Sequence, residues 1–382
     1  NLEANLSPRV LEGSCFAAMQ EELESFVSQV RDAAANHGAQ VALTGILPTL
    51  SKSDLSLENI TPRARYYALN DAMHRASKGA FRLRIQGTDE LMIEHDSVML
   101  EACNTSFQVH LQVAAEEFAS VYNAAQAVTG PVLAAAVNSP LLFGRRLWAE
   151  TRIALFQQSL DTRGTDLHMR EVSSRVRFGG SWILDSVVEL FQEDVAAFQV
   201  LLAQEVTEDP LEVLDRGGIP KLQALQLYNS TVYRWNRPCY GISNGKPHLR
   251  VECRVLPAGP TTTDEMANAV FWIGAVLGLA RQCEDLCERL DFDDIKGNFL
   301  AAARYGLKAN FRWEEGQVMS ATGLILDQLL PLAESGLRRQ GINDRHIERY
   351  LQVIEDRVAT GQTGAQWALD SLERLQGIRN RT

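Results

Sequence analysis

Two short stretches of the chain carry polar or ionisable side chains at every second position. In residues 248–256 these side chains are His248, Arg250, Glu252 and Arg254, and in residues 107–113 they are Gln108, His110 and Gln112. The positions between them are apolar. Because successive side chains of a strand point to opposite faces of a sheet, each stretch predicts a strand with one apolar face and one polar face.

The residue types on these polar faces are those that bind metals and phosphates. A carboxylate and a neutral imidazole can hold a divalent ion, and arginine presents a planar set of donors to phosphate or carboxylate oxygens. Residues 2–6 alternate in the same way and add Glu3 to the set. We therefore expect a nucleotide site on the polar face of an antiparallel sheet, although a solvated sheet face produces the same alternation.

Familiar nucleotide-binding and hydrolase motifs are missing from the sequence. It contains no GxxxxGK[ST] loop and no GxGxxG after a strand, so a nucleotide would be held by magnesium and arginines rather than by a glycine-rich loop. The GxSxG motif of serine hydrolases is absent as well. These absences argue against Rossmann and P-loop folds.

The composition is that of an ordinary globular protein, with 382 residues of which 46% are hydrophobic and 22% charged. The formal net charge of -11 disfavours nucleic-acid binding through a basic surface. Six cysteines without paired spacing predict no disulfide framework and indicate a cytoplasmic location. No apolar run approaches the roughly 20 residues that span a membrane, so we expect neither a membrane nor a nucleic acid as a partner.

The remaining pattern predicts an α+β fold. We expect helices in residues 13–38, from Thr61 onward, in 116–137 and through most of 263–381. We expect strands in residues 41–47, a three-stranded meander in 81–113, and a hairpin of residues 230–237 and 248–256. Residues 163–180 are a candidate lid loop. The chain opens within an alternating segment, so we expect upstream residues to be missing, and no linker divides it.

Eight segments, in this order, resemble glutamate-cysteine ligase family 2, which includes bacterial carboxylate-amine ligases. They are LEANLSP (2–8), GILPTL (45–50), ARYYALN (64–70), NTSFQVHLQV (104–113), NSPLLFGRRLWAETR (138–152), TVYRWNRP (231–238), HLRVECRVLPAGP (248–260) and FLAAARYGL (299–307). Each segment alone is weakly specific. Their common order and spacing along the whole chain make the resemblance specific.

The resemblance implies a fold similar to that of glutamine synthetases and guanidino kinases, in which an antiparallel sheet bends into a half-funnel with helices outside. It also implies an enzyme that uses ATP and Mg²⁺ to convert a glutamate-like carboxylate to an acyl phosphate, which an amine then attacks. Relatives commonly form homodimers. The positions that match the family's site are Glu3, His110 and Glu252 for the metal, Arg254 for the transferring phosphoryl group, Arg152 and Arg65 for the substrate carboxylates, and Arg250 and Arg237 for nucleotide phosphate.

The chain departs from the family pattern at its start. Members normally begin with a strand of the type Gly-x-Glu-x-Glu, whose carboxylates complete the metal cluster, and no such strand precedes Asn1. We therefore expect residues 1–382 to form a single ligase-like domain that is truncated at its N-terminus. Two alternatives stay open, namely a non-catalytic nucleotide- or amino-acid-binding protein of the same fold and a phosphotransferase that resembles the guanidino kinases.

Overall fold

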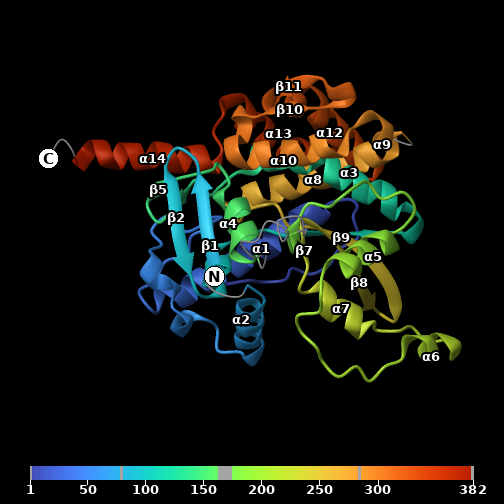
Figure 1. Ribbon diagram of the computed structural model, residues 1–382. Coiled ribbons are helices and arrows are strands. Elements are labelled where there is room, and N and C mark those ends of the chain that lie inside the picture. Colours follow the sequence, from blue (N-terminus) through green and yellow to red (C-terminus); the bar gives the residue numbers. More distant parts are fainter. Residues whose placement is uncertain (1, 78–80, 162–173, 283–284, 380–382) are drawn as a thin grey trace.

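Helices make up most of the computed structural model, and its strands form several small sheets (Figure 1). The structure describes residues 2–77, 81–161, 174–282 and 285–379. The longer helices are α1 (Cys15–Ala35), α2 (Ala64–Ser77), α3 (Phe118–Ala136), α8 (Thr262–Gln282), α10 (Phe292–Tyr305), α12 (Leu330–Arg339), α13 (Asp344–Thr360) and α14 (Gly364–Arg379). The shorter ones are α4 (Thr151–Ser159), α5 (Val187–Ala197), α6 (Pro210–Asp215), α7 (Gln223–Asn229), α9 (Leu286–Arg289) and α11 (Ala321–Gly323).

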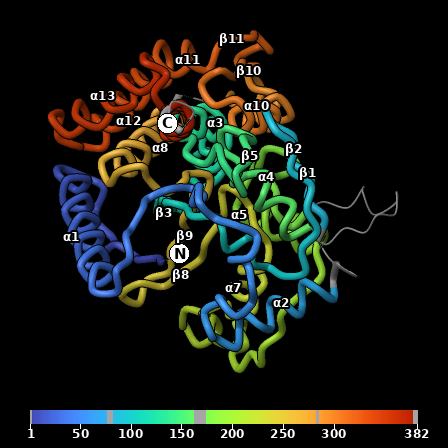
Figure 2. Tube along the Cα trace, turned by 90° about the vertical axis from the view of Figure 1, so that its left-hand side faces the viewer, coloured from blue at the N-terminus to red at the C-terminus, as the bar shows by residue number. Residues whose placement is uncertain are grey.

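The core of the molecule is built around α8 and α3. Helix α8 packs against α3, α12 and α13, and it also contacts α1 at the edge of the molecule (Figure 2). The buried apolar side chains form one contiguous cluster that includes residues from α1 to α14. Glycines let α8 and α12 approach closely, because a Cβ at Gly278 would lie 2.5 Å from the carbonyl oxygen of Leu332 and one at Gly336 would lie 2.5 Å from that of Gly274.

Strands β3 (Val109–Val113), β9 (Lys246–Cys253) and β8 (Asn236–Ser243) form an antiparallel sheet in the order β3-β9-β8. Alternate side chains of β3, among them Leu111, are buried. In β9 the apolar Val251 and Cys253 are buried together with Glu252, and α3 contacts β8 and β9. Strands β8 and β9 are joined through Asn244 and Gly245, which both have positive φ (51° and 72°), as a tight two-residue hairpin turn requires. The sheet thus has the apolar face that the alternation predicts.

The remaining strands form pairs. The antiparallel pairs are β1 (Phe81–Gln86) with β2 (Glu90–His95), β4 (Leu141–Leu142) with β5 (Arg145–Arg146), and β10 (Asn310–Arg312) with β11 (Val318–Ser320), and β6 (Val176–Arg177) pairs in parallel with β7 (Tyr233–Arg234). Helices beside small, mainly antiparallel sheets confirm the α+β class. The half-funnel stays a prediction. Residues 163–173 of the predicted lid lie outside the described residues.

Within the described part of the chain, no helix is both long and apolar enough to cross a membrane.

The segments 41–47 and 2–6 were predicted as strands, but both are irregular. In the first segment the N–H of Gly45 donates to the carbonyl of Asn138, while the carbonyl of Gly45 accepts from Thr105. The segment therefore bonds to two separate parts of the chain instead of forming a ladder with one. After the second segment, the backbone N–H and the hydroxyl of Ser7 both donate to Glu22, which attaches the start of the chain to α1.

The predicted meander in residues 81–113 is also wrong. Strands β1 and β2 form a separate hairpin, and β3 pairs with β9. Between them lies the 3₁₀ helix η3 (Val98–Cys103), which begins where the Ser97 hydroxyl accepts the N–H of Met99. The predicted second hairpin is confirmed, but its first strand, β8, runs from Asn236 to Ser243 instead of ending at Arg237.

Candidate functional site

The polar positions of β3, β9 and β8 lie in two neighbouring rows across the sheet. The first row consists of His110, Glu252 and Arg237, and the second consists of Gln112, Arg250 and Cys239. Arg254 follows directly after the end of β9. The antiparallel register therefore brings together most of the predicted site residues, although they come from segments that are far apart in the sequence.

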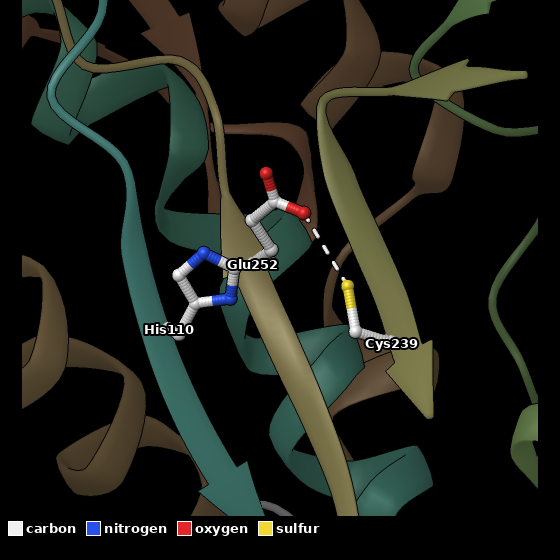
Figure 3. Close-up of side chains that lie close together, drawn as sticks. All are labelled: His110, Cys239 and Glu252. Carbon is white, nitrogen blue, oxygen red and sulfur yellow. Dashed lines mark hydrogen bonds between the residues drawn. The ribbon is translucent and has the colours of Figure 1, made fainter. Parts of the chain in front are cut away.

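Three of these side chains hold metal-ligand atoms close to one another (Figure 3). A ring nitrogen of His110, Sγ of Cys239 and a carboxylate oxygen of Glu252 all lie within 4.8 Å of one another. The thiol of Cys239 donates a hydrogen bond of 3.3 Å to Oε2 of Glu252. Since each of the three residues comes from a different strand, the cluster exists only when the sheet has formed.

Glu252 is the buried centre of the site, with 0% of its side chain exposed. Nε of Arg237 donates a hydrogen bond of 2.7 Å to its Oε2, and Nη1 of Arg254 lies 3.7 Å from its Oε1. Burial raises the pKa of the carboxyl group, but the charges of Arg254 and Arg237 outweigh burial, so the pKa is lowered. The carboxylate is therefore ionised at neutral pH. Its Oε1 has no hydrogen-bond partner among the described residues.

The imidazole and the thiol of the cluster are both neutral at neutral pH. Loss of surrounding water is the main cause that lowers the pKa of His110. Glu252 opposes this effect and nearby arginines add to it. Burial raises the pKa of Cys239 to about 11, and the charge of Glu252 adds to that rise. A neutral imidazole can bind a metal, whereas a thiol must first lose its proton.

These residues fit a Mg²⁺ ion that receives most of its ligands from elsewhere. Mg²⁺ commonly binds proteins through one or two carboxylates and keeps waters and phosphate oxygens as its other ligands. The buried Oε1 of Glu252, which makes no hydrogen bond among the described residues, is suited to that part. The imidazole of His110 is a less usual ligand for so hard an ion. The donor set is therefore sufficient for Mg²⁺ only together with phosphate oxygens.

The row of polar side chains continues from Glu252 toward the hairpin turn, where it borders a hollow. Nη1 of Arg250 lies 2.7 Å from Nε2 of His248. Both side chains lean over Gly241, where a Cβ would lie 2.9 Å from His248. Nε of Arg250 is buried without a partner in the described part of the chain. The hollow has a volume of about 180 Å³ and is lined by Arg237 and Arg250 together with residues of α5 and α7.

At the opposite end of the row, Arg254 lies near two aromatic residues, Tyr233 of β7 and Trp235, which follows β7. Its guanidinium carbon lies 5.9 Å from the ring centroid of Tyr233, and its backbone N–H donates to the carbonyl of Trp235 at 2.9 Å. Only 13% of the side chain is exposed. The guanidinium therefore faces Glu252 from a largely buried position, where its charge acts strongly on a bound anion.

Arg152 lies in the first turn of α4 and is buried. Its guanidinium donates to the carbonyl oxygens of Arg254, at 3.4 Å, and of Val255, and to Oγ of Ser106 at 3.3 Å. Its Nε lies 3.4 Å from Oε1 of the buried Glu150. These contacts are all inside the protein, and the role of Arg152 as a ligand of the substrate stays a prediction.

Two predicted site residues lie away from the cluster. Glu3 is exposed in an irregular segment, and the group of metal-ligand atoms found among the described residues does not include it. Arg65 is exposed on α2, where its guanidinium carbon lies 5.5 Å from the ring centroid of Tyr66. Their roles stay predictions as well.

Cys239 is not among the site residues predicted from the sequence, because the predicted strand ended at Arg237. The residues after Arg237 did contain a signal for Cys239, namely the Asn244-Gly245 turn. A turn centred on Asn244 and Gly245 fixes the hairpin register, and counting back from that turn places Cys239 opposite Arg250.

The fold and the site define an α+β protein with an arginine-rich sheet face around one buried carboxylate. The chain belongs to glutamate-cysteine ligase family 2 (GCS2), whose family model matches residues 2–380, and this confirms the resemblance seen in the sequence.

Among solved structures, the Pup ligase PafA of the prokaryotic ubiquitin-like modification pathway, in complex with ADP, is similar with a TM-score of 0.38 and 8% sequence identity. The match covers 99% of this chain and 63% of that one, so this chain spans less than two thirds of the length of PafA. A likeness this remote does not bear on activity. No curated protein matches the chain.

Proposed function

We propose that this chain is an ATP- and Mg²⁺-dependent ligase that activates a glutamate-like carboxylate and joins it to an amine. The main support is the buried Glu252, whose Oε1 makes no hydrogen bond among the described residues while His110, Arg237 and Arg254 lie around it. A buried polar atom without a partner is costly in a folded protein unless a ligand satisfies it. A metal ion bound together with nucleotide phosphates would satisfy this oxygen. Membership of GCS2 is consistent with the proposal.

In this proposal the polar row is divided between metal and phosphate. Glu252 and His110 hold Mg²⁺, which when bound neutralises phosphate charge and aligns the γ-phosphoryl group. Arg254 donates to the oxygens of the transferring phosphoryl group. Arg250 and Arg237 bind nucleotide phosphate beside the hollow. Glu3 is a further metal ligand and Arg65 binds a substrate carboxylate, as the resemblance implies. The resemblance gives Arg152 the same role as Arg65.

The proposed reaction has two transfers. An oxygen of the substrate carboxylate attacks the γ-phosphorus of ATP, so that a new P–O bond forms and ADP leaves. The nitrogen of the amine then attacks the carbonyl carbon of the acyl phosphate, loses a proton and displaces inorganic phosphate. The products are an amide, ADP and phosphate. In the first transfer Arg254 holds the phosphoryl oxygens, and the charge of its guanidinium offsets the negative charge that the carboxylate approaches.

ADP release and amide formation test the proposal. The protein is incubated with ATP, Mg²⁺, glutamate and a panel of amines, and the products are identified by mass spectrometry. We expect ADP release that requires both glutamate and an amine. It should fall by about tenfold or more in Glu252→Gln, but not in Glu94→Gln, a control that alters an exposed glutamate of β2. ADP release at the level of a protein-free blank for every pair would rule out the activity.

A second candidate is nucleotide binding without turnover. It is favoured by the observation that Arg237 and Arg254 already neutralise Glu252, while Glu3 lies outside the described metal-ligand group. Calorimetry that shows binding of ATP, in samples that form no ADP with any substrate pair, would support this candidate. A stable phosphorylated compound in place of an amide would indicate a phosphotransferase instead.

The wider architecture belongs to the same proposal. We propose that residues 1–382 form a single domain whose sheet bends into the family's half-funnel, and that the protein pairs as a homodimer in the cytoplasm. Light scattering of the purified protein tests the dimer, since a molecular mass equal to that of one chain would contradict it.

A further inference from the structure

Arg152 and Glu150 form a buried ion pair behind the end of β9. Their side chains are 2% and 0% exposed, and Nε of Arg152 lies 3.4 Å from Oε1 of Glu150. Glu150 is itself held by the backbone N–H of Asn138, at 2.8 Å, and by the hydroxyl of Ser139. Residues 138 and 139 therefore hold both oxygens of the carboxylate, and Glu150 in turn holds the guanidinium of Arg152.

The other side of the Arg152 guanidinium holds the backbone that carries Arg254. One nitrogen donates to the carbonyl of Arg254 at 3.4 Å and another donates to the carbonyl of Val255. The N–H of Arg254 is held in turn by the carbonyl of Trp235 at 2.9 Å. The backbone of Arg254 is thus fixed at both its N–H and its carbonyl group, and Arg152 supplies the second of these constraints.

The side chain of Arg254 depends on this backbone support, because its own contacts are loose. Its Nη1 lies 3.7 Å from Oε1 of Glu252, which is longer than a hydrogen bond. Its guanidinium carbon lies 5.9 Å from the ring centroid of Tyr233, in a cation–π contact. Loose contacts leave the guanidinium donors available to a ligand. They also leave the direction of the side chain to be set by its backbone.

We propose that Arg152 is a positioning residue, which together with Glu150 fixes the backbone of Arg254 and Val255 so that the Arg254 guanidinium stays beside Glu252. The inference rests on the proposed ligase function. It gives Arg152 a role that differs from the predicted one as a ligand of the substrate carboxylate. The two roles differ kinetically, because losing a substrate ligand raises KM for the carboxylate, whereas losing alignment in the transition state lowers kcat.

Steady-state kinetics of five variants separate these roles. We expect Arg152→Met to lower kcat by about 100-fold, with KM for the carboxylate substrate changed by less than about twofold. Arg152→Lys should recover part of kcat, since it restores a charge beside Glu150. Combining Arg152→Met with Arg254→Met should cost no more than Arg254→Met alone, because both act through one group. The control Arg216→Met alters an exposed residue directly after α6 and should behave as wild type.

Two outcomes would overturn the proposal. One is a large rise in KM with kcat retained in Arg152→Met, as expected for a substrate ligand. The other is a loss in the combined variant equal to the product of the two single losses, which would show that Arg152 and Arg254 act independently.

Removal of Arg152 alone leaves Glu150 buried without its charged partner, which can prevent folding. The variant that carries both Arg152→Met and Glu150→Gln removes both charges and is therefore measured in parallel. If the wild-type protein releases no ADP, the proposed function is rejected and kinetics cannot test the role of Arg152. The crystal structure of the variant with both substitutions then tests that role. Displacement of the Arg254 guanidinium from Glu252 would support positioning, and an unchanged 3.7 Å contact would overturn it.

Discussion

Replacement of Glu265 by glutamine should stabilise the protein at alkaline pH. Glu265 lies in the first turn of α8 with only 3% of its surface exposed, and its Oε1 accepts the N–H of Gly259 at 2.7 Å. Burial raises the pKa of its carboxyl from an ordinary value of 4.5 to about 7, and the charge of Asp264 adds to the rise while the Gly259 hydrogen bond opposes it. The amide oxygen of a glutamine at this position can accept the same hydrogen bond from Gly259.

The raised pKa makes stability fall as the pH rises. In the unfolded chain the carboxyl group ionises near pH 4.5, whereas in the folded protein it stays protonated up to about pH 7. The stabilisation from this bound proton is fully present below pH 4.5 and is lost as the pH rises through 7. A difference of about 2.5 pKa units corresponds to roughly 3 kcal/mol in the free energy of unfolding. Glutamine is neutral throughout and escapes this loss.

Denaturant unfolding of the wild type and of Glu265→Gln at a series of pH values measures the effect. We expect the variant to gain up to about 3 kcal/mol on the wild type between pH 4.5 and pH 8. The control Glu116→Gln alters an exposed glutamate just before α3 and should show no such gain. If the difference between Glu265→Gln and the wild type were the same at both pH values, the reasoning about Glu265 would be refuted.

Four further predictions concern the site and the core. Glu252→Gln should weaken Mg²⁺-dependent nucleotide binding in calorimetry without changing the circular dichroism spectrum, and His110→Asn should do so less strongly. Arg254→Lys should lower kcat more than nucleotide affinity, since lysine cannot offer paired donors to transition-state oxygens. Mg²⁺ without nucleotide should give no binding heat, because arginines surround the carboxylate of Glu252. Gly278→Ala should destabilise the protein by about 1–3 kcal/mol, since the added Cβ would lie 2.5 Å from a carbonyl oxygen of α12.

Each of these four has a result that would contradict it. Nucleotide binding in Glu252→Gln with unchanged Mg²⁺ dependence would contradict the first, and equal losses of kcat and nucleotide affinity in Arg254→Lys would contradict the second. Saturable Mg²⁺ binding without nucleotide would contradict the third. An unchanged melting temperature in Gly278→Ala would contradict the fourth.

The sequence predicted which residues share a face better than it predicted which strands pair. Alternation fixes the two faces of a strand, because one face must be buried, and residues 248–256 and 107–113 therefore revealed their polar sides. Alternation does not identify the neighbouring strand. Strand β3 was assigned to a local meander, yet it pairs with β9, since that choice depends on contacts between distant parts of the chain.

Arg152 shows a different limit of sequence reasoning. A match to a family motif identifies the residue but not the direction of its side chain. The carbonyl groups of Arg254 and Val255, which accept its hydrogen bonds, come from a segment far along the chain, and so do the surroundings that bury it. The contacts that give Arg152 its positioning role could therefore be found only in the folded structure.

The charge balance of the polar row determines the order in which its ligands can bind. Arginine stays protonated in proteins, so Arg237, Arg250 and Arg254 keep their positive charges, while Glu252 is ionised and His110 is neutral. A cation that approaches this row alone meets net positive charge, whereas a triphosphate meets free donors. Under the proposed function the nucleotide therefore binds first or brings the metal with it. In that proposal Oε1 of Glu252 would then complete a metal site together with phosphate oxygens.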